Sequence, residues 1–297
     1  MIGELAEKSK GRIRAFGYLP ASLPTDDSAT KDDKRYTIRR TDGGPKFTAR
    51  EPIQNWLDLL DTGIRPADVR LLGVNGGNVA GLEYRLAVAL GACVGVIENS
   101  GREAERVAAD WPAVRFERSP GKLMALPEDA MTIRAFLGAS DVEKQKIPAA
   151  KIEDAAKLSH QMFLEEQRYK NPDPVMQPWP KLRKDIQQSN LDQFTYLVSV
   201  LHKEGFDVRE FEGVPNDPKF TDEEVTRMGE MEHGRWNTER LEGGWKHDVK
   251  RDAAKKLSPY LVPWPVLPPD IQKYDLRNVR RWSQILAQVG YEIVRTK

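Results

Sequence analysis

Two histidine–aromatic clusters stand out in the second half of the chain. One contains His160 and Phe163, and the other contains His233 and Trp236. Aromatic rings bind flat heterocycles by stacking, and each stacked base contributes roughly 1–3 kcal/mol of binding free energy. We therefore expect Trp236 and Phe163 to clamp a nucleotide base from opposite sides. The residues that follow the second cluster add a further indole and the cations that phosphate groups need: Arg240, Trp245, Lys246 and Arg251.

Each of these side chains also has a purely structural interpretation. The two rings are equally consistent with an aromatic seam between packed elements, and Trp245 alone is typical of a core residue. His233 belongs to the candidate site by its position, although a histidine that hydrogen-bonds a neighbouring segment is the more common case. Neither histidine has further residues around it at metal-ligand spacing, so we expect no metal site.

A glycine-rich turn in the first half predicts a second anion site. The turn comprises Asn75, Gly76, Gly77 and Asn78, between a predicted strand and a predicted helix. Glycines let backbone N–H groups approach a phosphate, and the helix start adds positive potential. Glu98 ends the next predicted strand, where an acidic residue contacts a ribose hydroxyl in dinucleotide-binding folds. The spacing is not G-x-G-x-x-G, so a tight turn that needs glycine for geometry alone is the alternative.

One carboxylate is placed to suggest catalysis. Glu83 lies one turn into the helix after the glycine-rich turn, where it would suit a nucleosidase or phosphoribohydrolase. A solvated charge on the helix face is the competing interpretation. The chain shows no Ser-His-Asp arrangement, nucleophile elbow or P-loop. We therefore assign no catalytic residue and expect no cofactor.

The elements that must position these residues alternate between strand and helix in the first half. We expect strands at residues 12–20, 69–74, 93–97 and 114–116, helices at 52–60, 79–90 and 101–111, and a polar excursion over 21–50. Alternation with short connections predicts a Rossmann-like α/β domain with a parallel sheet over residues 1–140. A charged stretch, 141–156, is the expected linker.

The second half contains an internal repeat. Pro178-Trp179 and Pro263-Trp264 stand 85 positions apart (264 − 179), as do Gly205 and Gly290. Two such units usually pack as a pseudo-symmetric pair. We expect a mostly helical domain over residues 157–297, with a degenerate repeat at 157–206 and a full repeat at 221–297; its helices are predicted at 154–170, 191–204, 221–241 and 278–289.

Composition excludes several functions. The 46 basic residues balance the 45 acidic ones, which argues against binding of duplex nucleic acid. The single cysteine, Cys93, excludes a disulfide framework. No apolar run approaches the roughly 20 residues of a membrane span, so we expect no membrane insertion and a cytoplasmic location.

The full repeat resembles the ryanodine-receptor (RyR) repeat domain. The resembling residues run from Met231 to Trp245 through the His-x-x-Trp and Gly-Trp motifs, and from Pro259 to Pro268 through Leu-Val-Pro. The chain departs from the family pattern at Lys246-His247-Asp248. The resemblance implies that adenine nucleotides stack on Trp236, with Phe163 in the partner position.

The first half is similar, more weakly, to SLOG-type Rossmann-like nucleotide sensors. That resemblance implies a ligand along the turn at Asn75 to Gly77 and at Glu98. Together the two resemblances imply a bacterial sensor of an adenine-type nucleotide or nucleotide-derived signal, in signalling or antiphage defence. The expected protein partner is an effector domain or a second copy of the chain. The alternatives are a nucleoside-phosphate hydrolase and a purely structural or partner-binding module.

Overall fold

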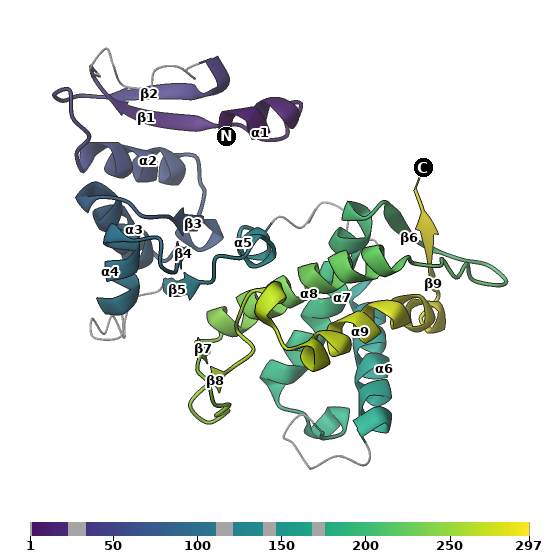
Figure 1. Ribbon diagram of the computed structural model, residues 1–297. Helices are drawn as coiled ribbons and strands as arrows, with labels where there is room; N and C mark the ends of the chain where they lie inside the picture. Colours follow the sequence, from purple (N-terminus) through teal and green to yellow (C-terminus); the bar gives the residue numbers. More distant parts are fainter. Residues whose placement is uncertain (1, 23–33, 111–120, 139–146, 168–175, 297) are drawn as a thin grey trace. The chain divides into compact units, whose positions relative to one another are not determined.

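The chain divides into two compact units. The computed structural model describes residues 2–22, 34–110, 121–138, 147–167 and 176–296 (Figure 1). Contacts between residues separate Met1–Ala125 from Leu126–Lys297. Within the described residues no helix combines the length and apolar character needed to cross a membrane.

An α/β layer forms the centre of the first unit. Strand β3 (Arg70–Gly73) leads through helix α3 (Asn78–Leu90) to strand β4 (Cys93–Ile97), which pairs with β3 in parallel. Helix α4 (Arg102–Asp110) follows, and β5 (Lys122–Leu126) completes the sheet in the order β3-β4-β5. Every residue of β4 is buried, because an inner strand covered on both faces must be apolar throughout. The predicted strand–helix–strand succession is confirmed, and the strand expected at 114–116 lies outside the described residues.

A second layer precedes this sheet in the chain. Helix α1 (Ile2–Lys8) leads to β1 (Phe16–Pro20), which pairs in parallel with β2 (Thr37–Thr41). Helix α2 (Arg50–Asp61) follows, and the short 3-10 helix Pro66–Asp68 leads into the sheet. Strand β2 falls inside the stretch expected to be a polar excursion. Its sequence, Thr-Ile-Arg-Arg-Thr, has one apolar residue, so hydrophobic alternation could not reveal it.

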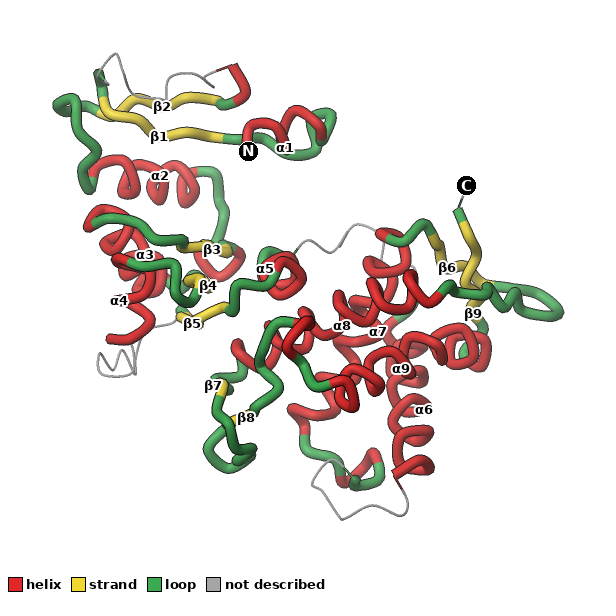
Figure 2. The backbone as a smooth tube through the Cα atoms, in the orientation of Figure 1, coloured by secondary structure: helices red, strands yellow, loops and turns green. Residues whose placement is uncertain are grey.

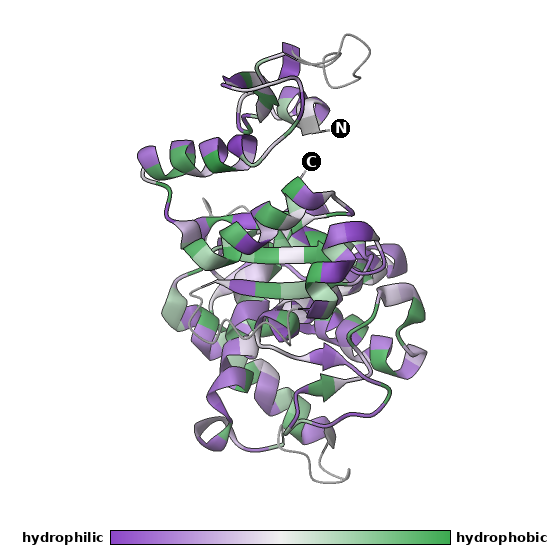
Figure 3. Ribbon diagram, turned by 90° about the vertical axis from the view of Figure 1, so that its left-hand side faces the viewer, coloured by the Kyte–Doolittle hydropathy of each residue, from purple (hydrophilic) through white to green (hydrophobic). Residues whose placement is uncertain are grey.

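Helices dominate the second unit (Figure 2). Hydrophobic and hydrophilic residues alternate along their ribbons (Figure 3). The helix that contains residues 231–235 has all five of them buried, so it is enclosed on more than one face. The elements in chain order are α5 (Ala130–Phe136), α6 (Ala149–Gln167), η4 (Trp179–Lys181), α7 (Lys184–Lys203), β6 (Phe206–Glu210), α8 (Asp222–Glu242), β7 (Lys246–His247), β8 (Leu257–Ser258), η5 (Trp264–Val266), α9 (Pro269–Gln288) and β9 (Tyr291–Arg295).

Helix α5 belongs to the second unit, although the sequence places it in the first. The hydroxyl of Thr238 on α8 donates to the backbone carbonyl of Thr132 at 3.1 Å, and the Asn237 amide donates to the Thr132 hydroxyl at 3.2 Å. Gly234 permits this approach, since a Cβ there would collide with the Met131 backbone. The unit boundary therefore lies 15 residues before the expected one (140 − 125), and the expected linker contains the start of α6.

The internal repeat is a pseudo-twofold pair. Helices α7 and α9 each have 20 residues, and both of their ends differ by 85 positions (269 − 184 and 288 − 203). Strands β6 and β9 keep the same offset and pair antiparallel side by side (Figure 1). Their register sets Val208 opposite Ile293, which are equivalent residues (293 − 208 is again 85). A residue that pairs with its own equivalent lies on a local twofold axis, which is the arrangement that the repeat offset predicts.

The same histidine contact closes both repeats. The Nε2 atom of His160 lies 2.7 Å from the carbonyl oxygen of Gln177, and that of His233 lies 2.9 Å from the carbonyl of Val262. Each imidazole also stacks on the aromatic ring three residues later, with centroids 6.1 Å and 5.8 Å apart. The histidines thus tie α6 and α8 to the segments that lead into the two Pro-Trp turns.

Candidate functional site

A pocket opens in the second unit, at the end of α8. It has a volume of about 180 Å³ and we call it the indole pocket; it is lined by Arg183, Asp185, Ile186, Trp236, Arg240, Trp245, Arg251, Ala253, Ser258 and Tyr260. The pocket joins the two repeats, because the first three residues begin α7 of the first repeat and the others belong to the second. Gly244, at a φ of +79°, turns the chain after α8 and sends it into the segment that carries β7 and β8 (Figure 2).

The two indoles of the pocket share a cation. The guanidinium carbon of Arg240 lies 5.7 Å from the ring centroid of Trp236 and 5.3 Å from that of Trp245. The side chain is only 13% exposed, and its Nε atom is buried without a hydrogen-bond partner among the described residues. Burial lowers the pKa of Arg240, partly offset by Glu239 and Asp185. The pocket therefore holds a buried cation that lacks a matched anion.

The wall from the first repeat carries its own ion pair. Arg183 donates through Nε and Nη2 to the two carboxylate oxygens of Asp185. Hydrogen bonds from Arg183 hold the pKa of Asp185 below its usual range. With Arg240 and Arg251, the lining contains three guanidinium groups and one carboxylate. The balance favours an anionic ligand.

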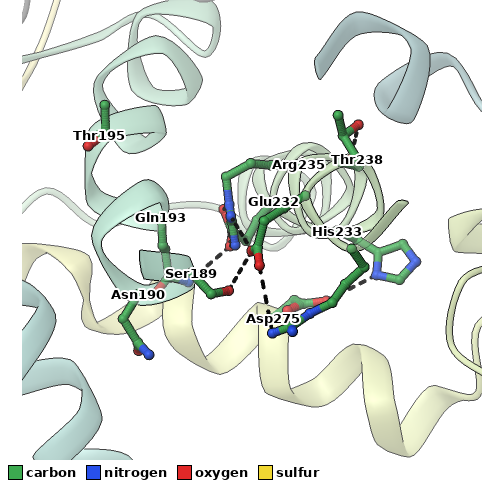
Figure 4. Close-up of polar contacts among 12 residues, drawn as sticks. Ser189, Asn190, Gln193, Thr195, Glu232, His233, Arg235, Thr238 and Asp275 are labelled. Atoms are coloured by element: carbon green, nitrogen blue, oxygen red, sulfur yellow. Dashed lines mark hydrogen bonds and ion pairs between the residues drawn. The ribbon is translucent and has the colours of Figure 1, made fainter. Parts of the chain in front are cut away.

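A buried polar network connects α7 and α8, the two helices that contribute residues to the indole pocket. Arg235 donates to Glu232 at 2.7 Å and to Glu239 at 3.1 Å (Figure 4). Ser189 donates to Glu239, and Gln193 donates to Glu232 at 3.2 Å, so the facing helix completes the network. Burial alone would lower the pKa of Arg235, but the two glutamates raise it and keep the side chain charged. The network fixes the helix face that presents Trp236 and Arg240.

Other residues of the predicted clamp lie elsewhere. Phe163 stacks on His160 and is not among the residues that line the indole pocket. The His233 side chain is 3% exposed, and its Nε2 atom contacts the backbone carbonyl of Val262. Lys246 is exposed on β7 and does not line the pocket. The second aromatic wall is therefore Trp245, from the same repeat as Trp236.

A larger cavity lies in the first unit, beside the start of α3. It has a volume of about 620 Å³, within the range typical of small-molecule sites. Its lining comprises Tyr18, Phe47, Glu51, Pro52, Asn55, Gly77, Asn78, Val79, Ala80, Glu83 and Arg102. We call it the α/β cavity. The sequence placed Gly77 and Asn78 in a ligand site, and both line this cavity.

The other residues of the predicted glycine-rich site do not line the cavity. Asn75 has a φ of +57° and donates its backbone N–H to the Ser100 hydroxyl at 3.0 Å. Gly76 has a φ of +81°, and a Cβ there would lie 2.6 Å from the Cβ of Ala80. These two residues shape the turn, as the geometric alternative holds. Glu98 is exposed after β4 and is also absent from the lining.

Glu83 is a half-buried carboxyl group that lines the α/β cavity. Burial raises its pKa, and a hydrogen bond from Asn55 partly opposes the shift. Arg102 lines the cavity beside Gly77, where its Nη2 would stand 3.0 Å from an added Cβ. The cavity thus combines a cation, the start of a helix and a carboxyl group that accepts protons more readily than usual.

Several lining residues escaped sequence reasoning. In the indole pocket these are the α7 wall and the late loop residues Ala253, Ser258 and Tyr260. In the α/β cavity they include Tyr18, Phe47 and Asn55. Tyr260 falls within the segment from Pro259 to Pro268 that resembles the RyR family, and the others belong to no motif. The repeat offset is the one feature of the sequence that could have indicated the α7 wall, because a pseudo-twofold pair brings the start of α7 toward the partner repeat.

Comparison with known proteins identifies one part of the chain. No curated protein matches it significantly. The family model of the RyR domain matches residues 218–295, which include α8, the segment with β7 and β8, and α9. Seven of the ten residues that line the indole pocket fall within the matched range. The second, complete repeat of this chain is therefore an RyR domain.

Proposed function

We propose that the protein binds a nucleotide-derived ligand in the indole pocket. The observation that carries the proposal is the pairing of two indoles with three guanidinium groups in one recess of an RyR domain. Indole faces stack on heterocyclic bases, and guanidinium groups bind phosphates through paired hydrogen bonds. The chemistry of the pocket thus matches both halves of a nucleotide.

The size of the pocket indicates which part of the ligand lies inside it and which part lies outside. At about 180 Å³ it is smaller than the roughly 300 Å³ at which typical small-molecule sites begin. We infer that the base enters the pocket and that the phosphates stay at its mouth. Arg251 lines the pocket, and Lys246 and Lys250 are exposed on the same β7–β8 segment.

The proposed role is that of a sensor. The resemblances to RyR repeats and to SLOG-type sensors support an adenine-type signal in bacterial signalling or antiphage defence. An effector domain or a second copy of the chain would then read the bound state. We infer that turnover is not required for this role.

Calorimetry tests the proposal with a panel of adenosine, AMP, ADP, ATP and cyclic adenine nucleotides. Trp245→Ala should weaken every ligand that binds the wild type by roughly ten- to a hundred-fold. Trp245→Phe should lose less, because a smaller ring still stacks. If the panel binds the folded Ala variant with unchanged affinity, the indole pocket is not the site.

The α/β cavity supports a second candidate, a nucleoside-phosphate hydrolase. The specific observation is that Glu83 lines a cavity of about 620 Å³ and has a raised pKa because of burial. A carboxyl group in that state suits a general acid. Chromatography of nucleoside monophosphates after incubation should then show release of base, which Glu83→Gln abolishes. Binding without release of base, or release that survives the substitution, contradicts this candidate.

A further inference from the structure

The space in front of the two indoles is already occupied. Stacked aromatic rings place their centroids about 4.5–7 Å apart. The guanidinium carbon of Arg240 lies at 5.7 Å and 5.3 Å from the two indole centroids, inside that range for both. A base that stacks on Trp236 and Trp245 together must therefore take the place of this guanidinium.

Arg240 is also poorly satisfied where it lies. Its one ion-pair distance among the described residues is 3.8 Å, to Glu239, whose carboxylate already accepts from Arg235 and Ser189. Its buried Nε atom has no acceptor in the part of the chain that the structure describes. Contact with the indole faces holds the cation in place, since an aromatic face attracts a cation. A new anion near the pocket would offer Arg240 the partner that it lacks.

We propose that Arg240 is the specificity-determining residue of the indole pocket and acts as a charge-selective gate. The inference rests on the proposed function. A neutral nucleoside must move the guanidinium away from two aromatic faces and offers it nothing in return. A nucleotide moves it equally, but its phosphate accepts hydrogen bonds from the displaced guanidinium. The pocket therefore admits phosphorylated ligands and excludes their nucleosides.

Calorimetry with AMP and adenosine separates this gate from a simple phosphate anchor. The wild type should prefer AMP by at least tenfold. In Arg240→Ala the affinity for adenosine should rise by roughly tenfold, because the cation–π contacts that oppose entry are gone. The affinity for AMP should fall in the same variant. A simple anchor predicts the fall for AMP with no change for adenosine, and that result overturns the gate.

Two further variants keep the test decisive. Arg240→Lys retains the charge, so it should still exclude adenosine even if the Ala variant fails to fold. Arg280→Ala removes a surface guanidinium that pairs with Asp222, and it should change neither affinity. Equal binding of AMP and adenosine to the wild type would refute the gate and leave the indole pocket as a site. Binding of neither ligand, nor of any other member of the adenine panel, would remove the proposed function itself.

Discussion

The two repeats of the second unit share a backbone plan and differ in what they add to it. Both contain a histidine that holds a backbone carbonyl, and helices of equal length follow both Pro-Trp turns. The interval from histidine to tryptophan is 19 residues in the first repeat (179 − 160) and 31 in the second (264 − 233). The extra residues form the β7–β8 segment, which walls the indole pocket. The contacts that both repeats share stabilise the fold, and the residues added in the second repeat form one wall of the indole pocket.

The buried Glu232–Arg235 ion pair distinguishes the second repeat from the first beside the shared histidine. Glu232 and Arg235 correspond to Ser159 and Met162 when the two histidines are aligned. Arg235→Ala should lower the free energy of unfolding by about 3–5 kcal/mol, because Glu232 is left buried without its partner. Urea denaturation followed by circular dichroism measures the loss.

The first repeat supplies the matched control for this prediction. The double variant Glu232→Ser/Arg235→Met installs its residues and removes both charges together. It should recover most of the lost stability. If the double variant is as unstable as Arg235→Ala, the network does more than pair two charges, and the equivalence of the repeats fails at this position.

The aromatic positions test which repeat binds. Trp236→Ala should weaken nucleotide affinity by roughly ten- to a hundred-fold, corresponding to a stacked base. Phe163→Ala removes the equivalent ring, which also stacks on its histidine but does not line the pocket. It should leave the affinity unchanged, as fluorescence titration can show. An equal loss of nucleotide affinity in both variants would support the original prediction that Phe163 and Trp236 clamp the base together.

Helix α8 begins with a capping box that helix α6 lacks. Thr221 accepts from the Glu224 backbone at 3.2 Å, and the Glu224 carboxylate accepts from the Thr221 backbone at 2.8 Å. Thr221→Ala should cost about 1 kcal/mol of unfolding free energy. Thr221→Asp should cost less, since Asp also caps helices. Equal stability of Thr221→Ala and wild type would show that Arg295, which also contacts Glu224, holds the helix start alone.

The smallest expected effect concerns the first unit. Burial raises the pKa of Glu83, so the folded state binds its proton more tightly than the unfolded state does. The stability that Glu83 contributes is therefore complete below its unfolded pKa, near 4.3, and is lost as pH rises through the folded value. Glu83→Gln should stabilise the protein at pH 8 relative to the wild type, and less so at pH 4. Thermal melts at both pH values provide the measurement, and a pH-independent difference contradicts the shift.

Sequence reasoning succeeded where periodic apolar residues decide the structure. Strand β4 was predicted at its observed bounds from the apolar run at residues 92–97, and the structure buries all five of its residues. The 85-residue offset seen in the sequence is kept by α7 and α9 and by β6 and β9, although the two strands were not predicted. The helix predicted at 221–241 matches α8 to within one residue at each end.

The incorrect or missing predictions concern features that tertiary contacts, and not the local sequence, determine. The local sequence does not indicate that α5 packs on α8. The role of Gly234 becomes clear only in the structure, where the Met131 backbone lies beside it. Phe163 and Trp236 are equivalent in sequence, which suggested that they face each other. Equivalent residues meet only near the twofold axis, and the axis passes instead through Val208 and Ile293. The α/β cavity depends on residues from β1 and α2 that carry no motif.

Hydrogen–deuterium exchange with and without an adenine nucleotide tests the central claim most directly. If the ligand binds the indole pocket, backbone amides of residues 183–186 and 236–260 should gain protection together, since both repeats wall that pocket. Residues 153–163 of the first repeat and 77–102 of the first unit should not change. Protection confined to 77–102 would place the ligand in the α/β cavity and contradict the claim that the RyR domain is the binding module.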